Sequence, residues 1–147
     1  MKDMEHLGEL LETFINRVSH PRGRTLTLIA EASVTVPQIV LMNFALNIPN
    51  STPSTLAAVM NISLPSVSQM IERLVKLGLL QRREDPEDRR SKTVEVTAKA
   101  RTFLTRLKAV RSGEYAEGTS GLSQATRRRL AEAISQALKE LPGLSGG

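Results

Sequence analysis

The run from residue 53 to residue 97 constrains the fold of this chain more than any other segment. Thr52 is of a residue type that is preferred as a helix N-cap, and a proline follows it at the first helical position. Asn61 lies where a tight turn needs a residue that tolerates left-handed backbone, and Ser63 caps a second helix. Gly78 then ends this second helix, as glycine commonly does. The pattern predicts two helices joined by a tight turn.

A two-stranded hairpin is predicted directly after these helices. Leu79 and Leu80 begin one strand, and Val94 and Val96 alternate with polar residues in the return strand. The two strands flank a charged tip of six residues, in which a proline breaks strand pairing. The sequence of the tip is Asp85-Pro86-Glu87-Asp88-Arg89-Arg90.

The second helix, residues 63–77, has two different sides. Val67, Ile71 and Leu74 recur at four- and three-residue spacing and are expected to face the core. A helix with small polar residues on its other side fits a DNA major groove, and a basic hairpin tip beside it reaches the backbone or the minor groove. The residues expected to face DNA from this helix are Pro65, Ser66, Ser68, Gln69 and Arg73.

Two interpretations of the hairpin tip are open. In the first interpretation, Asp88 and Arg90 only pair with each other across a solvated turn, an interaction worth well under about 1 kcal/mol. Alternatively, Asp88 orients Arg90 so that its guanidinium enters a narrow minor groove, where the negative potential is enhanced. The helix pair beside the hairpin favours the second interpretation. Taken alone, each feature of residues 53–97 also fits an ordinary solvated helical hairpin, and it is their order that indicates DNA binding.

Apolar residues recur at helical spacing near both ends of the chain. A monomer would leave both stripes only partly covered, so we expect them to be buried mutually across a two-fold axis. Such a dimer presents two recognition helices to successive major grooves, roughly 34 Å apart. The alternative is that these helices fold back onto their own core. The residues expected in the dimer contact are Leu7, Leu10, Leu11, Phe14, Leu130, Ile134 and Leu138.

The sequence also predicts helices and loops outside residues 53–97. Residues 25–29 fit either a short strand or a helical turn. Thr35, with Gln38 three residues later, predicts the start of a helix that runs through Leu46 and buries Val40 and Leu46 among others. Thr97 caps a further helix, residues 113–121 form a loop, and the last helix opens after Leu122-Ser123.

Composition excludes several classes of protein. The chain has 147 residues, is 40% hydrophobic and contains no cysteine, so disulfides and thiolate metal sites are excluded. No apolar run reaches the length of about 20 residues that a membrane span needs, and the acidic N-terminus is unlike a signal peptide, so we expect a cytoplasmic protein. Scarce aromatic residues argue against a platform that stacks single-stranded bases.

The net charge of +5 is unevenly distributed. Residues 52–97 hold seven basic and six acidic side chains, so a positive surface there must come from arrangement. Residues 98–147 hold nine basic and four acidic side chains. They include Arg127-Arg128-Arg129, which is either a solvated face or a contact with flanking DNA or an acidic partner.

An enzyme is not indicated, and no cofactor is expected. The chain has no nucleophile elbow, phosphate loop, paired carboxylate motif or cluster of histidines with metal-ligand spacing. His6 and His20 are read as surface residues, although a zinc site built across a dimer from histidine and carboxylates stays an alternative.

The residues from 55 to 97 resemble the MarR family of bacterial transcriptional regulators. The match is close over about 45 residues, and the Asp-Arg-Arg tip with the preceding Asp-Pro is its most specific part. The residues that carry the resemblance are Thr55-Leu56-Ala57, Ile62-Ser63, Val67-Ser68, Arg73-Leu74, Gly78-Leu79-Leu80, Arg83, Asp85-Pro86-Glu87-Asp88-Arg89-Arg90-Ser91 and Val96-Thr97.

This resemblance implies a mainly α fold with a small β-hairpin wing, that is, a winged helix-turn-helix with a helical dimerisation layer. It implies a homodimer, often a repressor, that binds a pseudo-palindromic double-stranded operator and is released by a small aromatic or anionic effector. Residues 63–73 would form the recognition helix, and Asp88 and Arg90 the pair at the wing tip, with Arg89 between them.

Four departures from the family pattern bear on these expectations. Gln69 stands where many relatives carry a basic residue, so groove contacts differ, and Ala100 replaces a frequent glycine. Residues 126–129 replace the acidic start that is common in the last helix. Without cysteine, the peroxide-sensing branch is excluded.

The expected organisation has three parts. Residues 35–97 form the DNA-binding region, residues 1–34 and 98–141 form the dimerisation region, and residues 142–147 form a flexible tail. The competing function is a winged-helix module used only for protein contact. Salt-dependent binding to duplex DNA separates the two, because phosphate contacts release counterions.

Overall fold

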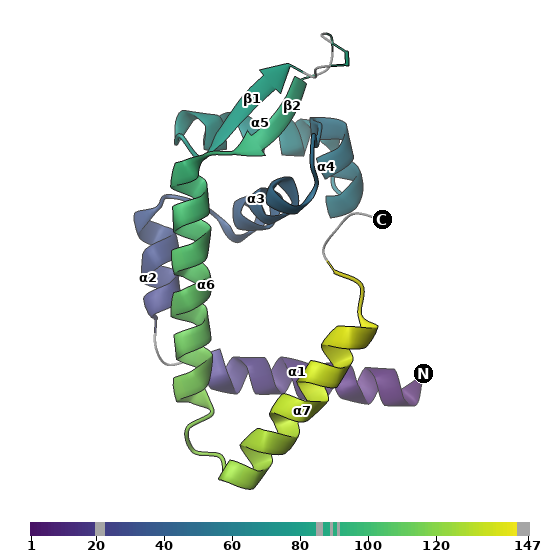
Figure 1. Ribbon diagram of the computed structural model, residues 1–147, viewed down its shortest axis with the longest axis vertical. Helices are drawn as coiled ribbons and strands as arrows, with labels where there is room; N and C mark the ends of the chain where they lie inside the picture. The colour runs from purple at the N-terminus through teal and green to yellow at the C-terminus, as the bar shows by residue number, and fades with distance from the viewer. Residues whose placement is uncertain (20–22, 85–86, 89, 91, 144–147) are drawn as a thin grey trace. The chain divides into compact units, whose positions relative to one another are not determined.

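A computed structural model describes residues 1–19, 23–84, 87–88, 90 and 92–143 (Figure 1). These residues form seven α-helices and one antiparallel hairpin, which confirms the expected mainly helical fold with a small hairpin. The chain separates into two compact units, Met1–Leu28 with Leu107–Leu141, and Ile29–Arg106. The elements are α1 (Lys2–Ser19), α2 (Arg24–Glu31), α3 (Val36–Asn47), α4 (Pro53–Met60), α5 (Leu64–Lys76), β1 (Leu80–Glu84), β2 (Lys92–Val96), α6 (Ala98–Gly118) and α7 (Gln124–Glu140).

Side-chain caps set the helix starts in the unit 29–106. The Thr35 hydroxyl accepts from the Gln38 backbone N–H, and the Gln38 side chain accepts from the Thr35 N–H at 3.0 Å, so both halves of a capping box are present. Thr52 and Ser63 cap α4 and α5 in the same way through their hydroxyls. Asn61 adopts left-handed backbone with φ 53° between these two helices. The turn predicted from the sequence is therefore confirmed.

The core of this unit lies where α3, α4, α5 and the hairpin pack together. Its most deeply buried side chains come from all four elements: Leu41, Met42, Leu56, Val67, Ile71, Leu74 and Leu80. The expectation that Val40 and Leu46 are buried is wrong, because both are exposed at the surface of α3. Helix α3 is apolar on nearly every side, and the spacing of its residues therefore does not reveal which side is covered.

The hairpin is tied to the start of the helix-turn-helix. Strand β1 pairs with β2 in the register Leu80 with Val96 and Glu84 with Lys92. The Val94 backbone N–H donates to the Ser51 carbonyl at 2.8 Å, and the Ser51 hydroxyl donates back to the Val94 carbonyl at 3.4 Å. Ser51 is buried, so this exchange satisfies polar groups that would otherwise lie unpaired in the core.

The structure settles the conformation of residues 25–29 and corrects the loop predicted for residues 113–121. Residues 25–29, which fitted a strand or a helical turn, lie in α2. The loop expected from Gly113 to Gly121 is wrong over most of its length, because α6 continues to Gly118. Residues 114–117 are compatible with a helix, and the two glycines at 113 and 118 do not interrupt it.

Gly118 allows α6 to approach the end of α1 closely. A Cβ atom at this position would overlap the Val18 carbonyl oxygen and would lie 2.7 Å from the Val18 Cα. Val18 is the one buried residue of α1, so this backbone contact holds α1 in place. At Gly113, on the same helix, a Cβ atom would meet nothing within 4 Å.

Among the described residues, no single helix is long and apolar enough to cross a membrane. Within that same part of the chain, α2 and α3 taken together across the bend between them match such a span by length and composition alone.

We expect Gly118→Ala to destabilise the protein by about 1–3 kcal/mol, because the added methyl group overlaps backbone atoms that cannot rotate away. Gly113→Ala is the matched control. It should stabilise the protein by up to about 1 kcal/mol, since alanine favours a helix and the space is open. Urea denaturation of the three proteins measures both changes. Equal stability of the two variants would contradict the close contact at Val18.

Candidate nucleic-acid interface and small-molecule pocket

Helix α5 has one side in the core and one side in solvent. Val67, Ile71 and Leu74 each have 0% of their surface exposed, which fixes the rotation of the helix about its axis. The residues predicted to face outward do so, with Ser68 half-buried at the edge of that surface. The exposed members of the set are Pro65, Ser66, Gln69 and Arg73.

The start of α5 offers hydrogen-bond donors to an anionic or polar ligand. The Ser63 hydroxyl accepts from the Ser66 N–H and donates to the Ser66 hydroxyl oxygen at 2.8 Å, so the Ser66 O–H can still donate outward. Gln69 lies one turn further along, and its amide can both donate and accept. The first turn holds no acidic residue, so the positive end of the helix dipole is not neutralised there.

The hairpin lies beside α5 (Figure 1). Its two adjacent arginines differ in their ion pairs. Arg83 Nε lies 2.8 Å from a Glu95 carboxylate oxygen, and Glu95 also accepts from the Gln81 side chain. Arg82 is exposed and forms no ion pair with any residue that the structure describes. Glu95 therefore balances one of the two charges. The sequence gives no sign of which arginine is paired, because that depends on the register of the strands.

At the hairpin tip, the Asp88 carboxylate accepts from the Arg90 backbone N–H at 3.0 Å. This bond is local, because the two residues lie two positions apart, and the stiffening of the tip by Asp88 stays a prediction. The direction of the Arg90 guanidinium toward DNA stays a prediction. Arg89, also predicted to contact DNA, lies outside the described residues.

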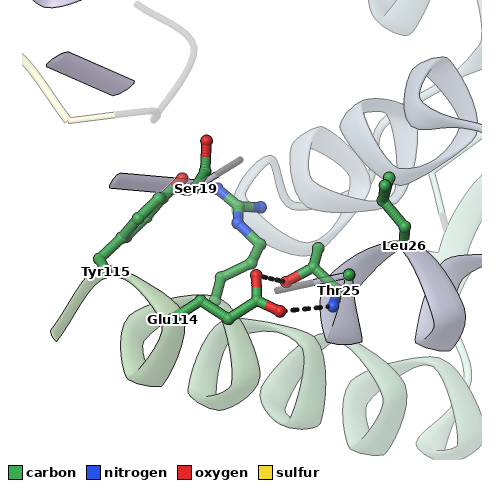
Figure 2. Close-up of a pocket in the computed structure, with 7 residues that line it drawn as sticks. Ser19, Thr25, Leu26, Glu114 and Tyr115 are labelled. Atoms are coloured by element: carbon green, nitrogen blue, oxygen red, sulfur yellow. Dashed lines mark hydrogen bonds between the residues drawn. The ribbon is translucent and has the colours of Figure 1, made fainter. Parts of the chain in front are cut away.

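A pocket of about 220 Å³ lies in the other unit, where α1 ends, α2 begins and α6 passes by (Figure 2). Figure 2 shows the Glu114 carboxylate of α6 facing the first turn of α2 at Thr25. This carboxylate accepts from the Thr25 N–H at 3.0 Å and from the Thr25 hydroxyl at 2.8 Å. The residues that line the pocket are Ser19, Gly23, Thr25, Leu26, Arg111, Glu114 and Tyr115.

Glu114 acts as an N-cap for α2 although it comes from another helix. It is only 4% exposed, and burial alone would raise the pKa of its carboxyl. The hydrogen bonds from Thr25 and from the Arg24 backbone, together with the Arg24 charge, outweigh burial and leave that pKa below its ordinary value. Arg24 also pairs with Glu117 at 2.6 Å, one helical turn along α6.

The lining of the pocket combines charged, polar and apolar side chains. Both oxygens of Glu114 accept hydrogen bonds from Thr25, which directs the carboxylate toward the start of α2. Arg111 supplies a positive charge, Tyr115 a phenol, and Leu26 an apolar side chain that is 70% exposed. Sequence reasoning identified none of these residues, because 89 positions separate Thr25 from Glu114.

No cluster of three or more histidine or acidic side chains suited to a metal ion occurs within the described ranges.

Comparisons with known proteins agree with this geometry. The model of the MarR family matches residues 34–92. A transcriptional regulator from Thermotoga maritima is 18% identical, with a TM-score of 0.73 over 95% of this chain and 94% of that chain. A MarR family protein from Bacillus stearothermophilus is 16% identical, with a TM-score of 0.72 over 95% of each chain. A mutant MepR from S. aureus bound to an oligodeoxyribonucleotide is 15% identical, with a TM-score of 0.63 over 95% of this chain and 98% of that chain.

At these identities the likeness establishes the fold. The expected winged helix-turn-helix architecture is therefore confirmed, with α4 and α5 as its helix pair and β1–β2 as its wing.

We expect the stability lost in Glu114→Gln to depend on pH. A lowered folded pKa means that the carboxylate contributes its full stabilisation above the ordinary carboxyl pKa, and that this contribution is lost as pH falls through the folded pKa. The variant should therefore melt at a lower temperature than the wild type near neutral pH. The two melting temperatures should converge below about pH 4.

Thermal melts followed by circular dichroism between about pH 3 and pH 7 measure this difference. Glu117→Gln is the control, because its ion pair with Arg24 is exposed and such pairs contribute little. A melting difference for Glu114→Gln that stays constant over the whole range would contradict the role of its charge.

Proposed function

We propose that this chain, whose residues 34–92 match the model of the MarR family, is a regulator of transcription that binds double-stranded DNA. One observation supports this most strongly. Helix α5 is fixed in the core by one side and presents Ser66, Gln69 and Arg73 to solvent on the other. A helix presented in this way, with a hairpin beside it, matches the major-groove docking of helix-turn-helix proteins.

In this proposal residues 35–97 form the DNA-binding region. Gln69 pairs with adenine through its amide, and Ser66 and Arg73 contact bases or phosphates beside it. Asp88 positions the tip from which Arg90 enters the minor groove. The protein acts in the cytoplasm, because a regulator of bacterial genes must reach the chromosome.

We further propose that the protein is a repressor released by a small anionic, aromatic molecule. The pocket beside Glu114 would take this effector, with Arg111 on its anionic group and Tyr115 and Leu26 on its ring. A volume of about 220 Å³ limits the ligand to roughly a single substituted ring.

The protein is proposed to act as a homodimer formed through residues 1–34 and 98–141. Helix α7 has no buried residue, and Leu138 is 67% exposed on it. On α1, Leu10 and Leu11 are about half exposed. Fully burying one such side chain contributes about 1.5–3 kcal/mol, so a second copy that covers both stripes would gain substantial stabilisation. The dimerisation set also includes Leu7, Phe14, Leu130 and Ile134.

Salt titration of duplex binding tests the function. A DNA-binding regulator should bind a genomic duplex pool with an affinity that falls steeply and linearly on a logarithmic salt scale. Sequencing of the retained fragments then identifies the operator and its genes. A protein that binds no duplex at low salt, but retains partner proteins, would be a winged-helix module for protein contact.

Arg82 and Arg83 form a matched pair for testing the wing. Both substitutions, Arg82→Gln and Arg83→Gln, remove one positive charge from β1. We expect Arg82→Gln to weaken duplex binding and to lower the salt slope by about one, because its charge is available to a phosphate. Arg83→Gln should leave the slope nearly unchanged, since Glu95 already pairs with that guanidinium. Equal salt slopes in the two variants would refute the assignment of Arg82, rather than Arg83, as the arginine that contacts a phosphate.

Dimer formation is tested by a charge placed on the exposed stripe of α1. Leu11→Lys should convert the dimer to a monomer in light scattering, since a buried unpaired ammonium is costly, and should weaken DNA binding strongly. Glu12→Lys is the control, because it changes charge at the next position of the same helix without entering the stripe. A Leu11→Lys protein that stays dimeric would exclude this stripe from the contact.

A further inference from the structure

The C-terminal end of α5 is held by the beginning of α6. The chain leaves α5 through Gly78, whose φ of +73° favours glycine. The Leu79 N–H closes back on the Leu74 carbonyl at 2.9 Å. The two carbonyls that follow α5 accept from the start of α6 and the residue before it. The Lys99 ammonium donates to the Leu77 carbonyl at 2.8 Å, and the Thr97 hydroxyl donates to the Gly78 carbonyl at 2.7 Å.

Lys99 also covers the glycine at this exit. A Cβ atom at Gly78 would lie 3.9 Å from both Cδ and Nζ of Lys99, so the lysine chain crosses over the turn. Its ammonium sits at the negative end of the α5 dipole, where a positive charge is favourable. The contact therefore combines a charge-assisted hydrogen bond with packing of the aliphatic chain.

The place of Lys99 in its own helix is unfavourable. It is the second residue of α6, and a positive charge near a helix N-terminus opposes the dipole of that helix. No acidic residue occurs in the first turn of α6 to offset it. A positive charge at an unfavourable helix position indicates that the residue has a compensating role elsewhere. For Lys99 this role is the contact with the end of α5.

We propose that Lys99 is a positioning residue for sequence readout. It fixes the C-terminal end of α5, while Ser63 and the core fix its other end and its rotation. Together these contacts set the angle at which the polar side of α5 meets a duplex. Hydrogen bonds to base edges tolerate displacements of only about 0.5 Å, whereas contacts to phosphates are more permissive. This inference rests on the proposed function of α5.

The test compares Lys99→Met with Arg101→Met. The first keeps an aliphatic chain over Gly78 and loses the ammonium. The second removes an exposed charge two residues further along α6, where the described residues provide no side-chain partner. Two probes are used, a duplex enriched by the wild-type protein from a randomised pool, and an unselected duplex of the same length.

We expect Lys99→Met to bind the selected duplex about tenfold more weakly, the scale of one misplaced base contact. Its binding to the unselected duplex and its salt slope should match those of Arg101→Met. Lys99→Arg should recover most of the lost preference, because its guanidinium can donate to the same carbonyl.

Two results would overturn the proposal. If Lys99→Met weakens binding to both duplexes equally and lowers the salt slope by about one, Lys99 contacts a phosphate directly. If it lowers only the melting temperature and leaves the preference between the duplexes unchanged, its role is structural.

A readout without DNA separates this inference from the proposed function. The amide hydrogen of Leu79 should exchange faster in Lys99→Met than in Arg101→Met, because the end of α5 is released. Should the wild type enrich no duplex, the proposed function fails, and amide exchange alone then decides whether Lys99 holds α5. Equal exchange in the two variants would overturn that contact.

Discussion

The burial of Val67, Ile71 and Leu74 is the constraint on which the unit of residues 29–106 depends. These side chains are completely covered, so α5 cannot turn about its axis without opening the core. The same burial decides which residues remain outside, and it leaves Ser66, Gln69 and Arg73 together in solvent. The caps at Thr52 and Ser63 determine where the two helices start.

Charge in residues 52–97 acts through arrangement, since their seven basic and six acidic side chains nearly cancel. Glu95 balances Arg83 on the hairpin and leaves Arg82 available, while Asp88 is engaged with the backbone at Arg90. The acids of the wing thus select which positive charges face a ligand. A nearly neutral segment can in this way still present a locally positive surface.

Local patterns in the sequence predicted the helix-turn-helix and the wing well. Asn61 at the turn, Gly78 at the exit of α5 and the apolar stripe of α5 each depend on neighbours within a few positions, so periodicity and capping chemistry reveal them. Contacts between distant residues were not predictable. The cap that Glu114 provides for α2, the approach of Gly118 to Val18 and the pairing of Arg83 with Glu95 depend on how elements pack.

The same reasoning explains the wrong boundary in α6. Glycine usually indicates a break in a helix, which made a loop from Gly113 the natural prediction. The absence of a side chain at Gly118 is instead required by the backbone of another helix, and nothing near that position in the sequence reports this contact. The identity of the residues in the small-molecule pocket was hidden for the same reason.

Amide chemical shifts of the isotope-labelled protein, recorded during titration with the enriched duplex, test the central claim most directly. If α5 and the wing form the DNA interface, the largest changes will fall on residues 64–73 and on the described residues of the hairpin. The amides of α1 will change little by comparison. Large changes confined to α1 and α7, with α5 unaffected, would contradict the account.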